Sequence, residues 1–420
     1  MFGIKIIGGN RLKGEVQVSG AKNASLPILA ACLLTSGECV LHGVPRLRDV
    51  EVMVEVLQAL GARVNWEGAT LTVCTREVKT TEIPEILMRK MRASNLVMGA
   101  LLGRCGSFKA STPGGCAIGS RPMDLHLKGF RSLGARIDQQ YGFTLGEARK
   151  VKGTFIHLDF PSVGATENLM MAAALAEGLT IIRNAAREPE IVDLQSFLCR
   201  LGARICGAGT HEIRIEGVST LGAGEHLIIP DRIEASTFLA AGVISQGEVM
   251  VFNAVAEHVE PVLSKLREMG AQIRVEEEGI WANSKGKYLQ SVDVKTLPYP
   301  GFPTDMQPQM VALLTQARGT SVVTETIFES RFKHVDELRR MGAQIRVEGR
   351  AAIIYGVSRL TGAVVEASDL RAGAALVLAG LVAEGETLVE GVHHLDRGYH
   401  NMEEKLQSLG ARIHRATLKT

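Results

Sequence analysis

The stretch "VEPVLSKLREMGAQIRV", residues 259–275, decides the fold of this chain because it contains a helix stop that recurs along the whole sequence. Its apolar residues follow the spacing of one helix face: Val259, Val262, Leu263, Leu266 and Met269. Gly270 comes next, and glycine suits the left-handed backbone conformation that ends many helices. The stretch therefore predicts a helix that ends at the glycine and is followed by a strand.

The phrase around Gly270 occurs six times, as LGARV once, LGARI three times and MGAQI twice. Its glycines are Gly61, Gly134, Gly202, Gly270, Gly342 and Gly410. Successive glycines are 73, 68, 68, 72 and 68 residues apart, which is longer than common solenoid repeats, so each unit should be a compact supersecondary structure. An earlier glycine in each unit ends another helix, one rich in small residues: Gly37, Gly106, Gly178, Gly247, Gly319 and Gly385.

Each unit therefore has a predicted order of helix, strand, helix, strand and strand. A chain of 420 residues that is 46% hydrophobic exceeds what one core usually organises. Six units divide most simply into two domains of three, with helices inside and sheets outside or the reverse. The sequence thus indicates an α/β protein with two domains built from repeats.

Charge and cysteine content argue against several classes of function. The formal net charge of +2 provides no general basic field for nucleic acid or for an anionic membrane. The apolar segment 372–383 is shorter than the ~18 residues that a membrane span needs, and Lys5 interrupts the N-terminal apolar run, unlike in a signal peptide. The seven cysteines form no C-x-x-C pair, which argues against a metal site and favours reduced thiols in the cytoplasm. Three of them are interpreted as buried apolar residues: Cys32, Cys105 and Cys199.

Charged or hydroxyl residues recur where the first helix of a unit is expected to begin. These residues are Lys22, Arg92, Ser162, Thr166, Arg232, Asp305 and Arg371. Capping explains Ser, Thr and Asp, but a cation at a helix N-terminus opposes the helix dipole, and a bound anion supplies a reason for it. A second set follows the next strand: Cys116, Arg121, Arg331 and Arg397. Taken singly, each arginine also fits a solvated surface charge.

No G-x-G-x-x-G or G-x-x-x-x-G-K-[ST] motif occurs, so side chains and helix ends would have to hold any phosphate. Arginine has a planar fork that matches carboxylate and phosphate, and several converging arginines suit a small anion with several charges.

Seven motifs, spread in order over the whole chain, closely resemble the UDP-N-acetylglucosamine 1-carboxyvinyltransferase family of enolpyruvyl transferases. They are "SGAKNASLPILAA", "KMRASNLVMGALLGR", "TPGGCAIGSRPMDLH", "SVGATEN", "GFPTDMQPQ", "ESRF" and "LDRGYHNMEEKLQSLGA". The resemblance implies a two-domain, inside-out α/β barrel-like fold of six βαβαββ-type units, three per domain. It implies one domain of residues 22–229, a second of residues 1–21 plus 230–420, two chain crossings, and a substrate cleft between the domains.

The resemblance also implies a reaction. The enolpyruvyl group of phosphoenolpyruvate passes to the 3'-hydroxyl of UDP-N-acetylglucosamine by addition and elimination, and phosphate is released. This is the first committed step of peptidoglycan precursor synthesis, and it needs no metal and no organic cofactor.

Residue roles are carried over from the family motifs. The residues expected to bind phosphoenolpyruvate are Lys22, Asn23, Arg121, Arg331, Arg371 and Arg397. Lys22, Arg121 and Arg397 would hold its phosphate, and Arg331 and Arg371 its carboxylate. The residues expected to bind UDP-N-acetylglucosamine are Arg92, Arg121, Pro122, Met123, Asp124, Leu125, Ser162, Val163, Gly164, Asp305 and Ile327. The expected catalytic residues are Cys116, Asp305, Lys22 and Arg397.

Two features qualify this assignment. Some family members have a lysine just before the "SVGAT" motif, where this chain has Phe160 and Pro161, so a diphosphate contact from that lysine is not expected. Asp305 is expected to accept the proton of the sugar hydroxyl, although Thr304 or Asp305 also fits a simple helix cap. The histidines near the motifs are given no catalytic role: His126, His393 and His394.

Two other functions are weighed against this one. A 3-phosphoshikimate 1-carboxyvinyltransferase shares the repeat and a similar anion clamp, but the Cys116 loop and the "GFPTDMQPQ" segment favour the amino-sugar enzyme. A non-enzymatic six-unit scaffold around nucleic acid would need a basic lining, which a net charge of +2 does not favour.

Cys116 is expected to be a reactive thiol rather than a buried apolar residue. Its neighbours Pro113, Gly114, Gly115 and Gly119 indicate a hinge-like loop, and nearby cations favour the thiolate. By resemblance, this thiol forms an adduct with phosphoenolpyruvate, is a candidate proton donor, and is alkylated by the epoxide antibiotic fosfomycin.

The substitution Cys116→Asp tests this role. Aspartate keeps an ionisable group in the loop but offers no thiol, so turnover should persist with an altered pH profile while inactivation by fosfomycin is lost. The measurement is the rate of inactivation of both proteins by fosfomycin. Inactivation of the variant at the wild-type rate would exclude Cys116 as the target.

Overall fold

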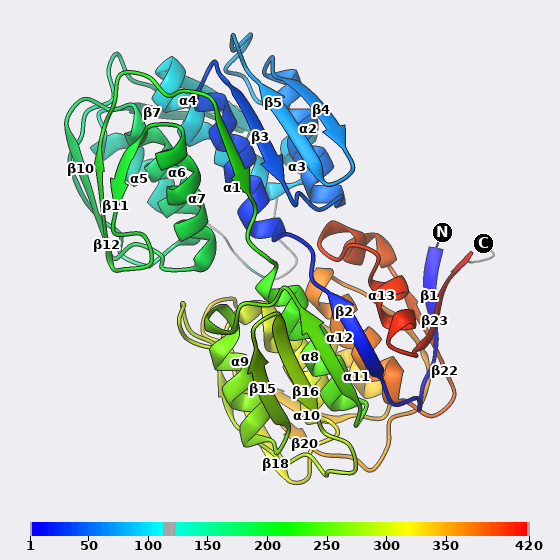
Figure 1. Cartoon of the computed structure of the whole chain (residues 1–420). Helices are drawn as coiled ribbons and strands as arrows, with labels where there is room; N and C mark the ends of the chain where they lie inside the picture. Colours follow the sequence, from blue (N-terminus) through cyan, green and yellow to red (C-terminus); the bar gives the residue numbers. More distant parts are fainter. Residues whose placement is uncertain (1, 112–118, 120–122, 418–420) are drawn as a thin grey trace. The chain divides into compact units, whose positions relative to one another are not determined.

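The computed structural model of the chain describes residues 2–111, 119 and 123–417. These residues separate into two compact units, which Figure 1 shows in sequence colours. The 20–229 unit contains residues 20–111 and 123–229. The 230–417 unit contains residues 230–417, the N-terminal residues 2–19 and residue 119. Each unit is described by itself.

The 20–229 unit has three sheets, with strand orders β13-β3-β5-β4, β6-β8-β7 and β11-β12-β10-β9. Its strands are β3 (Glu38–His42), β4 (Arg63–Glu67), β5 (Thr70–Cys74), β6 (Ser107–Ser111), β7 (Arg136–Gln140), β8 (Phe143–Glu147), β9 (Phe155–His157), β10 (Leu179–Arg183), β11 (Arg204–Cys206), β12 (Glu212–Glu216) and β13 (Gly224–Leu227). Its helices are α1 (Lys22–Ala31), η1 (Cys32–Leu34), α2 (Arg48–Ala59), α3 (Glu85–Lys90), η2 (Arg92–Leu96), α4 (Val97–Cys105), α5 (Asp124–Ser132), α6 (Val163–Ala174) and α7 (Pro189–Arg200).

The 230–417 unit also has three sheets, with strand orders β15-β16-β14-β2, β17-β18-β20-β19 and β21-β22-β1-β23. Its strands are β1 (Phe2–Ile7), β2 (Lys13–Gln17), β14 (Glu248–Phe252), β15 (Gln272–Glu276), β16 (Gly279–Asn283), β17 (Val294–Lys295), β18 (Thr320–Thr324), β19 (Gln344–Glu348), β20 (Ala351–Tyr355), β21 (Val364–Glu366), β22 (Glu386–Glu390) and β23 (Arg412–Thr417). Its helices are α8 (Arg232–Ile244), α9 (Ala256–Glu268), η3 (Thr304–Met306), α10 (Gln307–Leu314), α11 (His334–Arg340), α12 (Leu370–Val382), η4 (Val392–Arg397) and α13 (Met402–Ser408).

The sheets repeat one pattern, which confirms the six-unit organisation. In the third unit, β9 and β10 pair in parallel across α6, and β10 then pairs with β12 and β12 with β11 in antiparallel fashion. The order β9, α6, β10, α7, β11, β12 is the expected βαβαββ. The helix-ending glycines of the repeated phrase all have positive φ, between 91° at Gly342 and 111° at Gly61, as the helix stop requires.

The first helix of each unit lies inside its domain, so the expected arrangement with helices inside and sheets outside is the observed one. Helices α8, α10 and α12 contact one another, as α4 and α6 do in the 20–229 unit. Helix α6 is buried from Ala165 to Ala174 and α12 from Arg371 to Leu381. A helix that is apolar on all sides is typical of such an interior position.

Strands from distant parts of the sequence complete several sheets. Strand β13, which precedes α8, pairs in parallel with β3, while β2 pairs in parallel with β14. Next to these strands, the chain passes from one unit to the other at residues 19–20 and 229–230. Strand β1 pairs with both β22 and β23, so the N-terminal residues form an inner strand of the last sheet.

Two of the cysteines interpreted as buried apolar residues are exposed, which corrects that expectation. Cys32 is buried, and burial raises the pKa of its thiol well above the usual value. Cys105 and Cys199 are exposed because they lie in the last turns of α4 and α7, which face solvent. Within the described residues, no helix has the length and apolar character that crossing a membrane requires.

The N-terminal strand gives a stability prediction. Ile6 is fully buried in β1, whereas the adjacent Ile7 is 40% exposed. Ile6→Ala should lower the free energy of unfolding by about 2–5 kcal/mol because it removes buried methyl groups and leaves a cavity, while Ile7→Ala should stay within ~0.5 kcal/mol of wild type. Urea unfolding of the two variants measures this. Equal effects would show that β1 does not pack as an inner strand.

Candidate functional site

Helix starts carry the predicted site residues, as the repeat comparison anticipated. Lys22 begins α1, Arg92 begins η2, and Arg371 is the second residue of α12. Ser162 is the N-cap of α6, where its Oγ accepts a hydrogen bond from the backbone N–H of Ala165 at 3.4 Å. The structure describes two groups of these residues, one in each unit.

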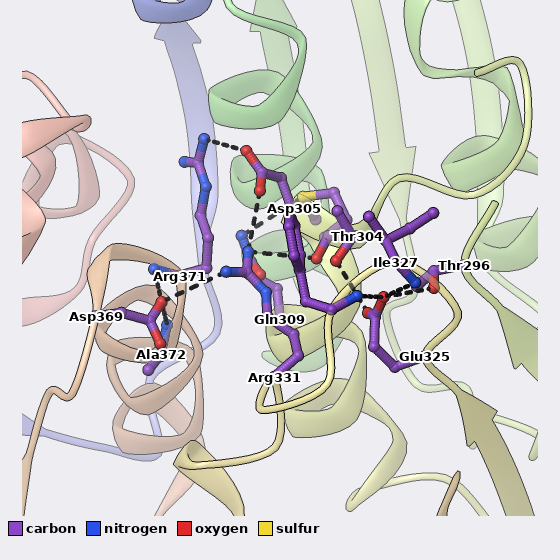
Figure 2. A network of polar contacts seen from close by, with 12 residues as sticks. Thr296, Thr304, Asp305, Gln309, Glu325, Ile327, Arg331, Asp369, Arg371 and Ala372 are labelled. Carbon is purple, nitrogen blue, oxygen red and sulfur yellow. Dashed lines mark hydrogen bonds and ion pairs between the residues drawn. The ribbon is translucent and has the colours of Figure 1, made fainter. Parts of the chain in front are cut away.

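The group in the 230–417 unit centres on Asp305, which lies between two arginines (Figure 2). Arg331 Nη2 donates to Asp305 Oδ1 at 3.0 Å, and Arg371 Nη2 donates to Asp305 Oδ2 at 3.0 Å. The arginine side chains are only 3% and 4% exposed, while Asp305 is 27% exposed. One carboxylate therefore bridges two buried guanidinium groups and remains accessible to solvent.

Both arginines keep N–H groups that no described residue accepts. These atoms are Nε of Arg331, and Nε and Nη1 of Arg371, all of them buried. Burial opposes the charge of Arg371, but the nearby Asp305 and Tyr399 outweigh it and raise the pKa of Arg371 above its usual value. Buried, charged donors without acceptors are costly. The arrangement is thus suited to an anionic ligand with several oxygens.

Helix capping does not describe Asp305. Pro303 and Met306 occupy the N-cap positions of η3 and α10. The side chain of Asp305 instead bonds the two arginines, and the Thr304 hydroxyl donates to Glu325 at 2.9 Å. Asp305 is therefore part of a charged cluster rather than a simple end to a helix.

Four further residues of this unit complete the description. Asp369 caps α12, accepts from the backbone N–H of Arg371 at 2.9 Å, and lies 3.9 Å from Arg331 Nη1. Ile327 follows β18, and its backbone N–H donates to Glu325. Arg397 ends η4 and is half-buried. Asp369 and Glu325 were not singled out from the sequence.

The group in the 20–229 unit contains an ion pair that the sequence did not indicate. Lys22 Nζ lies 2.6 Å from Asp49 Oδ2, and the side chains are 12% and 4% exposed. Asp49 lies in the first turn of α2, where acidic residues are common because they interact favourably with the helix dipole. The sequence around Asp49 therefore did not predict an ion pair with Lys22. Asn23 follows Lys22 in α1. A buried carboxylate thus fixes the predicted phosphate-binding lysine.

A polar network joins the two segments expected to bind the sugar nucleotide, residues 123–125 and 162–164. Asn168 Nδ2 lies 3.1 Å from His126 Nδ1 and donates to the carbonyl of Gly164 at 3.3 Å. Asn168 Oδ1 accepts from the backbone N–H of Gly99 at 2.7 Å. Burial and Arg92 lower the pKa of His126 to about 4, against the opposing effect of Asp124. His126 is therefore neutral at pH 7 and accepts a hydrogen bond at Nδ1.

Three of the predicted residues fall outside the described part of the chain: Cys116, Arg121 and Pro122. Their roles stay predictions from the sequence. Among the described residues, no group of His, Cys, Asp or Glu side chains is arranged to hold a metal ion.

Comparison with known proteins gives a consistent result. The model of the EPSP synthase (3-phosphoshikimate 1-carboxyvinyltransferase) family matches residues 6–406. UDP-N-acetylglucosamine 1-carboxyvinyltransferase 1 of Symbiobacterium thermophilum is 59% identical over 98% of this chain and 94% of its own length. UDP-N-acetylglucosamine 1-carboxyvinyltransferase 2 of Carboxydothermus hydrogenoformans is 58% identical over 98% of this chain and 99% of its own length.

A solved structure agrees with the fold. The enolpyruvyl transferase NikO from Streptomyces tendae superposes with a TM-score of 0.89 at 26% sequence identity, covering 100% of this chain and 99% of that chain. The two-domain fold of six repeated units expected from the sequence is therefore confirmed as the enolpyruvyl transferase fold.

The pKa of His126 gives a prediction for stability. The unfolded histidine takes up a proton as the pH falls through 6.5, whereas the folded one resists protonation until about pH 4. Stability is therefore lost as pH falls across this window, by roughly 3 kcal/mol from this group. His126→Gln removes the titrating group, so unfolding free energies measured by urea at pH 7 and pH 4.5 should differ less than in wild type. Identical differences would assign the acid sensitivity to other groups.

Proposed function

This chain belongs to the EPSP synthase (3-phosphoshikimate 1-carboxyvinyltransferase) family, and we propose that it transfers the enolpyruvyl group of phosphoenolpyruvate to the 3'-hydroxyl of UDP-N-acetylglucosamine. The chain is a transferase, and its relatives at 58–59% identity act on UDP-N-acetylglucosamine according to their names. In the structure, the supporting observation is the pair of buried arginines with N–H groups still available around Asp305.

The chemistry has two balanced steps. In the addition, the sugar hydroxyl oxygen bonds to C2 of phosphoenolpyruvate, C3 gains a proton, and the hydroxyl loses one. In the elimination, C3 loses a proton and the C2–O bond to phosphate breaks, which leaves the enol ether and inorganic phosphate. The site therefore needs an acid, a base and groups that hold two anions.

The arginines suit the carboxylate of phosphoenolpyruvate. Each guanidinium has five N–H donors in one plane, and Asp305 accepts a hydrogen bond from the Nη2 of each arginine. Nε of Arg331, together with Nε and Nη1 of Arg371, remains available to carboxylate oxygens. The substrate carboxylate and Asp305 can thus share the same two cations, and the proposed phosphate ligands are Lys22, Arg121 and Arg397.

The sugar nucleotide is assigned to residues of both groups. They are Arg92, Arg121, Pro122, Met123, Asp124, Leu125, Ser162, Val163, Gly164, Asp305 and Ile327. Among them, Asp305 is the carboxylate that is proposed to take the proton of the 3'-hydroxyl, since two arginines orient it and its side chain is 27% exposed. Asn23 completes the phosphoenolpyruvate ligands, and Cys116 supplies the thiol.

The cellular role follows from the reaction. We place the enzyme at the first committed step of peptidoglycan precursor synthesis, and hence in cell-wall biogenesis, cell shape and cell division. The described cysteines are all free thiols, which suits a reducing cytoplasm. Cys116 makes it a proposed target of fosfomycin.

One assay separates this function from that of the sister enzyme. Phosphate release is measured with phosphoenolpyruvate and either UDP-N-acetylglucosamine or shikimate 3-phosphate as acceptor. We expect phosphate release when the acceptor is UDP-N-acetylglucosamine and none when it is shikimate 3-phosphate. Release with shikimate 3-phosphate alone would assign the chain to the other branch of the family, and release with neither would contradict the proposal.

Asp305→Asn tests the proposed base. The amide keeps the shape of the side chain but lacks its charge and basicity, so turnover should fall by roughly 10²-fold or more while UDP-N-acetylglucosamine still binds. The control is Asp336→Asn, which changes a carboxylate that is 78% exposed on α11 and should leave turnover unchanged. Steady-state phosphate release and calorimetric binding measure the two effects. Near-normal turnover of the Asp305 variant would move the role of base to another group.

A further inference from the structure

Glu325 is a buried carboxylate to which no role has been given so far. It follows β18 and is 1% exposed. The structure satisfies it with neutral hydrogen-bond donors: Oε1 accepts from Thr296 Oγ1 at 2.9 Å, and Oε2 accepts from Thr304 Oγ1 at 2.9 Å. A buried carboxylate is costly to keep unless its oxygens are fully bonded, so these donors and this side chain hold one another in place.

On one side, Glu325 fixes the residue that precedes Asp305. The Thr304 hydroxyl donates to Glu325, and the Thr304 carbonyl accepts from Arg331 Nη2 at 3.4 Å. The same Nη2 donates to Asp305 at 3.0 Å. The backbone that precedes Asp305 is therefore held through both the side-chain hydroxyl and the carbonyl of Thr304 (Figure 2).

On the other side, Glu325 fixes the loop between β18 and α11. The backbone N–H groups of Ile327 and Phe328 donate to Glu325 Oε1 at 2.8 and 3.1 Å. Thr296 supports this turn because its Oγ1 accepts from the backbone N–H of Thr326 at 2.9 Å. One carboxylate thus ties two site segments that lie 22 residues apart, since Ile327 and Asp305 differ by that number.

We propose that Glu325 is a positioning residue, which sets the place of Asp305 relative to the backbone of Ile327. This inference rests on the proposed function, in which Asp305 takes the proton of the sugar hydroxyl and Ile327 contacts the same substrate. Glu325 touches neither reacting atom. It acts by keeping the carboxylate of Asp305 correctly placed relative to the bound sugar nucleotide. A misplacement of about 1 Å can lower turnover by up to roughly 10²-fold.

The experiment breaks this link at Thr304 rather than at the buried carboxylate. Thr304→Val keeps the shape of the side chain but removes the hydroxyl, whereas Thr304→Ser keeps the hydroxyl. We expect Thr304→Val to lower kcat roughly tenfold or more and to raise the KM for UDP-N-acetylglucosamine more than the KM for phosphoenolpyruvate. Thr304→Ser should restore both constants to near wild type.

The matched control is Thr326→Val, which lies in the same loop. Its hydroxyl donates to the Thr296 carbonyl at 2.6 Å rather than to the carboxylate of Glu325. The control should lose little turnover. Equal losses in Thr304→Val and Thr326→Val, or equal kinetics for Thr304→Val and Thr304→Ser, would overturn the proposal.

Amide hydrogen exchange provides a readout that needs no substrate. Loss of the Thr304 hydroxyl should speed exchange at the amides of Ile327 and Phe328, while Thr304→Ser should leave it slow. Unchanged exchange in Thr304→Val would overturn the proposed link between the segments. Faster exchange in Thr304→Val, combined with a wild-type protein that releases no phosphate from phosphoenolpyruvate with either acceptor, would support the link and contradict the proposed function.

Discussion

The burial of two arginines around one carboxylate is the constraint that organises the 230–417 unit. Arg331 and Arg371 are nearly inaccessible to water, so their charges require a partner inside the protein. Asp305 bridges the two guanidinium groups and Asp369 lies 3.9 Å from Arg331 Nη1, yet several N–H donors of the arginines remain unused. Such a cluster is unfavourable for stability alone, because a buried pair seldom exceeds the stability of apolar side chains of the same volume. Its unused N–H donors instead favour an anionic ligand.

The repeat explains how residues far apart in sequence reach this cluster. Asp305 is the second residue of the inner helix segment of the fifth unit, and Arg371 is the second residue of that of the sixth. Helices α10 and α12 contact each other, so equivalent positions at their starts lie at the same end of the unit. Arg331 enters from the loop after the next strand. The same positional rule applies in the 20–229 unit, where Lys22 begins α1 and Ser162 caps α6.

The periodicity of the sequence predicted the fold well because helix stops are local signals. The positive φ of Gly61 and its equivalents, the starts of the inner helices and the burial of those helices all follow from short stretches. The pairing of β13 with β3 and of β2 with β14 does not, because it depends on which distant segment completes a sheet. The exposure of Cys105 was missed for a related reason: composition indicates the average position of a thiol, but the last turn of a helix can face solvent.

The candidate site was predicted unevenly, and the pattern has a physical cause. Lysine and arginine at helix starts were singled out as candidate anion ligands because a positive charge there opposes the helix dipole. Two of the carboxylates that hold the site together were missed, since Asp49 in the first turn of a helix and Glu325 just after a strand are unremarkable in sequence. Their importance comes from burial, which depends on the tertiary structure. A carboxylate such as Glu325, bonded to two hydroxyls and two backbone amides, transmits the position of one loop to another without contacting a substrate. Residues of this kind become visible when hydrogen bonds are followed outward from the predicted ligands, because the accuracy of a site depends on what holds its ligands in place.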